Sequence, residues 1–345
     1  MRKSVKLKDI VEYAKGSQIN GDNLIEEAEF DYLNGGINPS GKWNETNCDA
    51  NTITISEGGN SCGYVNYMRK PFWCGAHCYY LYNVVGNTQY LYYALKSQQD
   101  RIMKLRSGAC MPNIKKGDLG DFEFDFDDDV KGQEKVTNIL SKLESVIEER
   151  KQELLCLDKL TKARFVEMFG NPRLNEKGFK CKKGFELFKI SNGKAVSNEK
   201  RFESGIPAYG GNGISWYTNT VLFEEDTIVI GRVGFQSGNV HFVKGPMWIT
   251  DNAMYISELY DDSLSLVFLC DMMEQIDFTR DQDAGDLKKV TQKPFMEMEY
   301  ILPEKSLQKE YIDFVHQVDK SKVAVQKALD ETKLLFDSLM QKYFG

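Results

Sequence analysis

The chain has 345 residues, of which 41% are hydrophobic and 28% charged, so a disordered or collagen-like protein is excluded and the length predicts two domains with cores of their own. Its net charge of -7 argues against nucleic-acid binding if the charge is spread evenly. Because no run of 18 apolar residues is present and the basic start leads into no apolar segment, we expect no membrane association and no secretion, and we place the protein in the cytoplasm.

Two short β-branched runs, residues 53–55 and 64–68, predict neighbouring strands early in the chain. Gly58 and Gly59 lie between them and predict a turn that needs positive φ. Pro71 follows the second run and ends that strand, because proline has no backbone N–H to donate. This part of the chain is therefore predicted to be a glycine-rich β region.

The eight cysteines are scattered, and in a chain without a secretion signal we interpret them as reduced thiols. Cys74 and Cys78 are the closest pair, with His77 between them. A zinc site needs four ligands at repeated short spacings, and no second pair matches this one, so we predict no metal. The alternative is an unfamiliar catalytic centre formed by these three residues.

Residues 118–129 contain seven acidic residues and no basic one. Removing these seven from the 51 acidic residues leaves 44, which equals the number of Lys and Arg, so basic surfaces can exist elsewhere. The block precedes a long helical pattern, and acidic side chains favour the start of a helix because of its dipole. We therefore predict a structural role; the alternative is a docking surface for a basic partner.

Residues 133–169 run for 37 positions without proline, which predicts a helix about 55 Å long. Its apolar residues follow alternating steps of four and three, as in a heptad pattern: Val136, Leu140, Leu143, Ile147, Leu154 and Leu157. Gly170 is predicted to cap its C-terminal end.

The second half of the chain repeats this plan. Residues 227–230 and 239–243 predict strands, Pro246 ends the second of them, and residues 210–213 predict a turn with positive φ. A second proline-free helix is predicted at residues 308–344. Its heptad positions are Tyr311, Val315, Val318, Val325, Leu329, Phe336, Leu339 and Tyr343. Lys322 and Arg150 interrupt the two seams, and polar seam residues often fix the register of paired helices.

An internal repeat with a period of 175 residues connects the two halves. Matched residues at this separation include Gly59 and Gly234, Gly63 and Gly238, Pro71 and Pro246, Trp73 and Trp248, Gln133 and Gln308, and Phe169 and Phe344. So many matches in one register predict a tandem duplication. Trp73 and Trp248 are interpreted as core residues.

The predicted fold is α/β (α+β), with two similar globular domains joined by two long helices that form an antiparallel coiled coil, in a pseudo-twofold internal repeat. The predicted boundaries are 1–128 and 171–304 for the globular domains, and 129–170 and 305–345 for the central and C-terminal helices. The alternative is two separate amphipathic helices, each packed on its own domain.

Several segments together resemble the specificity subunit of type I restriction–modification enzymes. They are residues 206–214, 224–234, 238–240, 248–253, 287–294 and 339–345 in the second copy, and 111–119 and 164–170 in the first. The resemblance covers essentially the whole chain. One departure is residues 125–129, where an acidic run replaces the proline-rich stretch of the family; Leu302 and Pro303 keep that feature in the second copy.

The resemblance implies a non-catalytic DNA-recognition subunit with two target-recognition domains. Each domain would read one half of a bipartite target in double-stranded DNA, while the helices set the spacing and dock two modification (methyltransferase) subunits. Restriction (endonuclease and translocase) subunits would join the complex. S-adenosylmethionine, ATP and Mg²⁺ would be used by those partners and not by this chain. In agreement, the sequence has no Asn-Pro-Pro-aromatic motif, no P-loop and no dinucleotide-binding motif.

Base edges are read by polar side chains in the major groove, and phosphates are bound by Lys, Arg and N–H groups. In the second domain the candidates for bases are Tyr209, Asn212, Arg232, Gln236 and Asn239, and those for phosphates are Lys288, Lys289 and Lys293. In the first domain they are Asn34, Lys42, Asn60, Ser61, Arg69 and His77, with Asn113, Lys115 and Lys116 near phosphates. For each of them the alternative is a turn former or a solvated loop residue.

The loops of the two copies differ at matched positions. Residues 60–62 are Asn-Ser-Cys where residues 235–237 are Phe-Gln-Ser, and His77 matches Asn252. Different side chains at equivalent positions predict different half-sites, and therefore an asymmetric target. The competing hypothesis is a coiled-coil protein-interaction scaffold without DNA specificity.

Overall fold

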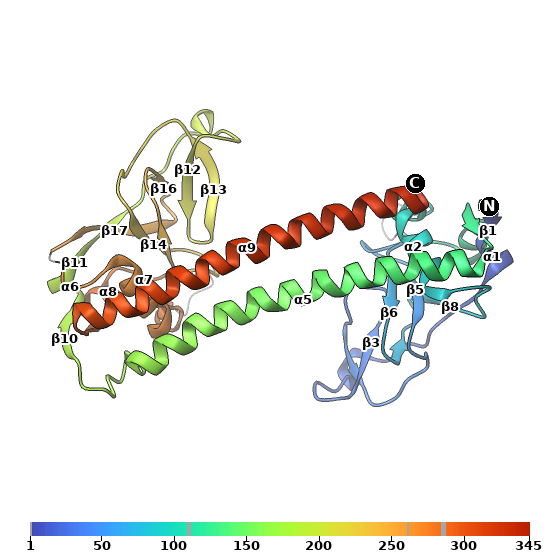
Figure 1. Ribbon diagram of the computed structural model, residues 1–345, viewed down its shortest axis with the longest axis horizontal. Coiled ribbons are helices and arrows are strands. Elements are labelled where there is room, and N and C mark those ends of the chain that lie inside the picture. The colour runs from blue at the N-terminus through green and yellow to red at the C-terminus, as the bar shows by residue number, and fades with distance from the viewer. Residues whose placement is uncertain (1, 109–111, 261, 284–287) are drawn as a thin grey trace. The chain divides into compact units, whose positions relative to one another are not determined.

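The computed structural model describes residues 2–108, 112–260, 262–283 and 288–345 (Figure 1). Two segments quoted for the resemblance include Met111 and Leu287, which lie outside the described residues. The chain forms two compact units: Met1–Lys151 with Lys327–Gly345, and Gln152–Gln326. Each unit therefore contains part of both long helices.

The first unit contains three antiparallel or mixed sheets among its described residues, with strand orders β2-β8-β5-β6, β4-β3-β7 and β1-β9. The strands are β1 (Arg2–Lys6), β2 (Glu12–Lys15), β3 (Phe30–Leu33), β4 (Gly41–Trp43), β5 (Thr52–Ser56), β6 (Val65–Met68), β7 (Phe72–Cys74), β8 (Cys78–Tyr82) and β9 (Glu123–Asp127). The short helices are α1 (Leu7–Ile10), α2 (Thr88–Ser97), α3 (Gln99–Met103), α4 (Lys116–Gly120) and the 3₁₀ turn η1 (Gly21–Asn23).

The second unit repeats this topology over its described residues, with orders β11-β17-β14-β15, β13-β12-β16 and β10-β18. Its strands are β10 (Lys180–Lys183), β11 (Phe188–Asn192), β12 (Ile206–Gly210), β13 (Gly213–Thr218), β14 (Thr227–Gly231), β15 (Val240–Val243), β16 (Trp248–Ile249), β17 (Ala253–Leu259) and β18 (Glu299–Leu302). Its short helices are α6 (Gly184–Leu187), α7 (Leu266–Ile276), α8 (Lys293–Glu297), η2 (Asn198–Lys200) and η3 (Phe278–Asp281). The predicted duplication is confirmed, because the strands correspond one to one.

The two long helices are α5 (Val130–Phe169) and α9 (Lys305–Phe344). Each has 40 residues and begins three residues before the proline-free runs that start at Gln133 and Gln308. The added turn forms because the N–H groups of these two glutamines donate to the carbonyls of Asp129 and Glu304. Asp129 caps α5, since its carboxylate accepts a hydrogen bond from the Lys131 N–H at 3.2 Å. Gly170 has a φ of 71°, as predicted for a C-terminal cap.

The long helices pack against each other inside each unit, as the heptad pattern predicted (Figure 1). In the second unit Arg164 of α5 pairs with Glu310 of α9 at 2.9 Å, and Asp158 pairs with Lys322 at 2.7 Å. Positions rise along α5 as they fall along α9, so the helices are antiparallel. Lys322, which interrupts the apolar seam of α9, is therefore paired with Asp158 of α5. The alternative of two separate helices is wrong.

Residues 123–127 of the acidic block form strand β9, so only the end of the block, at Asp129, lies at a helix start as predicted. Phe122, Phe124 and Phe126 alternate with acidic residues and are buried, while β9 pairs with the basic strand β1. Lys3 pairs with Asp128 at 2.8 Å. The acidic residues therefore face a basic segment of the same chain. The period-two alternation was visible in the sequence and predicts a strand.

The predicted glycine turns are confirmed in part. Gly59 has a φ of 75° and Gly213 a φ of 97°. Gly58 and Gly210 have no positive φ, because Gly58 forms a bridge with Asn113 and Gly210 ends strand β12.

Candidate nucleic-acid interface

Loops from three strands meet around a hollow of about 410 Å³ in the second unit. It is lined by Val196, Arg201, Gly210, Gly211, Asn212, Ser215, Trp216, Val233, Phe235, Gln236, Thr250, Asp251 and Asn252. The predicted residues Asn212 and Gln236 both line it, although 24 positions separate them in the chain. The β12–β13 turn supplies the first residue and the loop after β14 supplies the second.

The loop after β14 is held close to the rest of the unit. A Cβ atom at Gly231 would lie 2.3 Å from the carbonyl oxygen of Gln236, so only glycine permits this approach. The Gly238 N–H donates to the Gly231 carbonyl at 2.8 Å, and the Gly234 N–H donates to the Lys288 carbonyl at 2.8 Å. The loop therefore presents the side chains at its tip from a fixed backbone.

Other predicted base contacts have partners within the unit. The Arg232 guanidinium donates to the Asp251 carbonyl at 3.3 Å and is otherwise exposed. The Asn239 amide donates to the side-chain oxygen of Gln236, which leaves the Gln236 NH₂ group as the donor that can face a ligand. Tyr209 is half-buried against a cluster that includes Met247 and Val229, and burial raises its pKa, so its ring packs on the core and is not among the residues that line the hollow.

The predicted phosphate lysines fall into two groups. Lys288 is exposed, and its ammonium lies 5.5 Å from the ring centroid of Phe235. Lys289 is also exposed and forms a β-bridge with Val233, so both lysines border the loop after β14. Lys293 instead begins α8, where its ammonium lies 3.7 Å from the Glu297 carboxylate.

The prediction missed Arg201 and Trp216, which both line the hollow. The Arg201 guanidinium lies 5.0 Å from the ring centroid of Trp216. Such a cation and aromatic pair offers one face for stacking and several N–H donors. Alternation in residues 213–218 is a strand signal that could have identified Trp216, but nothing local indicates that Arg201 lies over it.

The first unit presents a matching set of loops. Asn60 is exposed on the Gly59 turn, whereas the Ser61 hydroxyl donates to the Gly35 carbonyl at 2.6 Å and holds the turn in place. The Asn34 side chain accepts from the His77 N–H at 3.3 Å, and the His77 ring is 64% exposed. Three predicted residues, Asn34, Ser61 and His77, therefore belong to connected loops of this unit.

The remaining candidates of the first unit lie on other elements. Lys42 is exposed on β4, and Asn113 forms bridges with Gly58 and Ser107. Lys115 and Lys116 are exposed at the start of α4, where the Lys116 ammonium lies 5.4 Å from the Tyr13 ring centroid. Arg69 follows β6, at the end of the strand away from Asn60.

Arg69 is directed toward the long helix α5. Its guanidinium donates to the Glu144 carboxylate at 2.6 Å and lies 5.5 Å from the Tyr67 ring centroid. Glu144 also accepts from the Tyr93 hydroxyl at 2.8 Å. Through these contacts Arg69 connects the sheet that contains β6 to helix α5.

Three cysteines lie together near His77 in the core of the first unit. Cys48, Cys74 and Cys78 are buried, and the Cys74 thiol lies within hydrogen-bonding range of the other two. These thiol contacts and the burial raise the pKa of Cys74 far above its ordinary value, whereas nucleophilic and metal-binding cysteines need a stabilised thiolate. Within the described ranges, no cluster of three or more His, Cys, Asp or Glu side chains has a metal-binding arrangement.

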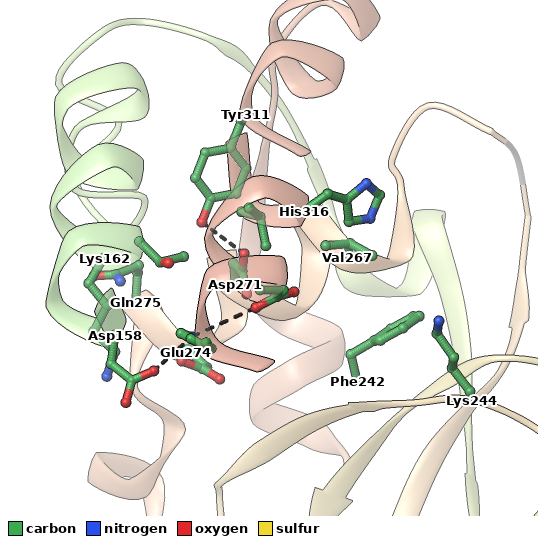
Figure 2. Close-up of a pocket in the computed structure, with 14 residues that line it drawn as sticks. Asp158, Lys162, Phe242, Lys244, Val267, Asp271, Glu274, Gln275, Tyr311 and His316 are labelled. Atoms are coloured by element: carbon green, nitrogen blue, oxygen red, sulfur yellow. Dashed lines mark hydrogen bonds and ion pairs between the residues drawn. The ribbon is translucent and has the colours of Figure 1, made fainter. Parts of the chain in front are cut away.

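A second hollow of about 450 Å³ lies in the second unit between α7, α5 and α9 (Figure 2). The Tyr311 hydroxyl points toward Asp271 and donates to its carboxylate at 2.8 Å. Burial raises the pKa of Asp271 to about 6. The walls of this hollow carry charges of both signs, such as Glu274 and Lys162, and this pattern does not suit an anionic ligand.

Of the helices in the described part of the chain, none combines the length and apolar character that a membrane span requires.

Comparisons with known proteins follow the same division of the chain. The model of the "Type I restriction modification DNA specificity domain" family matches residues 2–156 and 176–332. The chain belongs to this family. Its two specificity domains correspond to the two copies of the sequence repeat.

Relatives with similarity along the whole chain carry the same description. A putative type I specificity subunit of Mycoplasma genitalium is 27% identical, with 96% of this chain and 90% of that protein covered. One from Mycoplasma pneumoniae is 28% identical, covering 98% of this chain and 94% of that protein. The crystal structure of a type I restriction–modification S subunit from M. genitalium superposes with a TM-score of 0.71 at 25% identity, over 100% of this chain and 96% of that one. This specificity-subunit chain therefore shares its fold with a solved S subunit.

Proposed function

We propose that the chain is the non-catalytic specificity subunit of a type I restriction–modification complex, and that each unit reads one half of a bipartite, asymmetric target in double-stranded DNA. One observation carries the proposal: both units hold the same loop scaffold but display different side chains on it. Asn60 of the first unit corresponds to Phe235 of the second, and His77 corresponds to Asn252. One fold that presents two surfaces suits two different half-sites.

The second unit offers the chemistry that base reading needs. Asn212 and the free NH₂ group of Gln236 supply side-chain amides, and Arg232 supplies a guanidinium. Amides suit the major-groove edge of adenine and guanidinium groups suit guanine. Lys288 and Lys289 border the same loop and suit phosphates, which position a protein on DNA without selecting a sequence.

The long helices suit the docking of two modification subunits and, through them, of restriction subunits. Apolar side chains stay exposed along both helices: Ile139, Leu334 and Leu335 in the first unit, and Leu155, Leu160, Val166 and Val323 in the second. A partner that buries such exposed apolar side chains gains free energy from their removal from water. In this proposal S-adenosylmethionine, ATP and Mg²⁺ are used by the partner subunits, and this chain needs no cofactor.

The same exposed side chains favour the second candidate, a coiled-coil scaffold that binds proteins without DNA specificity. The net charge of -7 also favours it, because the chain has little general attraction for DNA. On the first proposal, this charge makes tight DNA binding depend on the modification subunits. A gel-shift comparison with and without those subunits separates the two candidates. A scaffold would show no sequence-specific DNA binding under either condition.

The decisive test is to sequence modified adenines in cells that carry this chain together with its modification subunit. We expect one bipartite motif with unlike halves and a fixed spacer. A palindromic motif would contradict the asymmetric reading. Methylation that depends on the modification subunit but shows no motif would support the scaffold.

A further inference from the structure

A tight turn that follows β5 in the first unit and β14 in the second has the same backbone in both copies. Its paired glycines have positive φ in each case: 75° at Gly59 and 86° at Gly63, 91° at Gly234 and 94° at Gly238. Its hydrogen bonds also match. Gly63 donates to Ser56 at 2.8 Å, as Gly238 donates to Gly231 at 2.8 Å. The turn is therefore one scaffold used twice.

The side chain at the tip of this turn differs between the copies. The first unit carries Asn60 there, and the second carries Phe235, which is 81% exposed. Exposed apolar side chains of this size do not contribute to a core, and this one stands on a rigid backbone. The Gln282 amide donates to the Phe235 carbonyl at 3.4 Å and to the Ser237 carbonyl at 2.6 Å. These two hydrogen bonds hold the backbone of the turn in place.

The surroundings of Phe235 place an apolar ring among polar readers. Gln236 lines the same hollow beside it, and Asn212 lines it from the neighbouring turn. Lys288 lies over the ring at 5.5 Å and is free to reach a phosphate at the edge of the groove. The major groove offers one apolar group on its base edges, the C5 methyl of thymine, and phenylalanine is among the residues that contact it.

We propose that Phe235 contacts the C5 methyl group of a thymine in the half-site read by the second unit, and so determines part of that unit's specificity. This inference rests on the proposed function. Asn60, with its amide in the same place, makes no such contact in the other half-site. On the same turn, the second unit thus presents an apolar side chain to DNA and the first unit presents a polar one.

The test uses the complex with its modification subunits and the target found by adenine sequencing. Each thymine of the target is replaced singly by deoxyuridine, which lacks the methyl group, and Kd is measured by fluorescence anisotropy at one salt concentration. We expect one substitution, in one half-site, to weaken the wild-type complex by roughly three- to tenfold, the effect of one buried methyl group in contact with a ring.

Variants assign that effect to the ring. Phe235→Ala and Phe235→Asn should each bind the thymine target with a similar loss, and neither should respond further to deoxyuridine at that position. Phe185→Ala, which removes another exposed ring of the same unit, should keep the full response.

A response to deoxyuridine that persists in Phe235→Ala overturns the inference. So does a wild-type complex whose Kd changes at none of the substituted thymines, and so does a target that contains no thymine. Absence of any sequence-specific binding by the wild-type complex refutes the proposed function instead.

Discussion

The side chain of Asp271, on α7, is a carboxyl group whose ionised form destabilises the folded chain. This half-buried side chain lines the hollow between α7 and the two long helices, where burial raises its pKa from 3.8 to about 6, and the hydrogen bond from Tyr311 offsets only part of that rise. A group whose folded pKa is raised binds its proton more tightly in the native state. The stability it contributes is therefore present below about pH 4 and is lost as the pH rises through about 6.

Asp271→Asn should remove this dependence, because the amide is neutral and its oxygen still accepts from Tyr311. We expect the variant to be more stable than the wild type at pH 7.5 by on the order of 2 kcal/mol, and the difference to vanish near pH 4. Urea unfolding at several pH values measures it. A difference that stays constant with pH would contradict this assignment of the charge.

At the scale of elements, each long helix is fastened near its start by a buried glutamine. Gln133 accepts from the Asn87 N–H at 2.8 Å, and Gln308 accepts from the Ser265 N–H at 3.2 Å. Their NH₂ groups donate to backbone carbonyls, Gln133 to that of Asp127 at 2.6 Å. Both therefore connect the globular part of a unit to its helix through backbone groups just before α2 or α7.

Replacing such a glutamine leaves buried backbone groups without partners. We expect Gln308→Leu to lower the free energy of unfolding by about 1–3 kcal/mol, the cost of unsatisfied buried polar groups. Gln317→Leu, at an exposed position of the same helix, should change it by less than about 0.5 kcal/mol. Equal effects of the two variants in denaturant unfolding would show that the hydrogen bonds of Gln308 do not matter.

At the scale of the whole molecule, the exposed apolar residues of the helices are the features that neither unit's core explains. Leu334 is 69% exposed and Leu335 is 50% exposed on α9, within the first unit. Their exposure costs the folded chain little, but a partner that covers them gains from their burial. This matches a chain whose family carries DNA specificity domains and whose proposed partners carry the chemistry.

Leu334→Glu should therefore weaken the complex with modification subunits by roughly tenfold or more, since a charge would enter an apolar contact. The fold should be unaffected, because the position is exposed. Lys333→Glu adds more negative charge at the adjacent exposed position and should weaken the complex much less. Analytical ultracentrifugation of the purified complexes gives the comparison, and equal assembly by all three proteins would exclude this helix face from the interface.

Much of the fold follows from local patterns in the sequence. The heptad spacing from Val136 onward, the matched glycines, and the β-branched runs predicted the helices, the duplication and four strands, because side-chain periodicity is set by backbone geometry alone. The alternation of Phe122, Phe124 and Phe126 carries the same kind of signal for β9, and the expectation of a helix start there overlooked it.

The candidate site depends on contacts that no local pattern encodes. The sequence by itself determined the two copies, their helices and the residues that differ between them. Only the tertiary structure decided that Arg201 lies over Trp216, that Asn239 occupies the oxygen of Gln236, and that Phe235 stands exposed beside Lys288. These neighbours come from separate strands and loops, and their approach is fixed by how the sheets pack, which is a property of the whole unit and not of any segment.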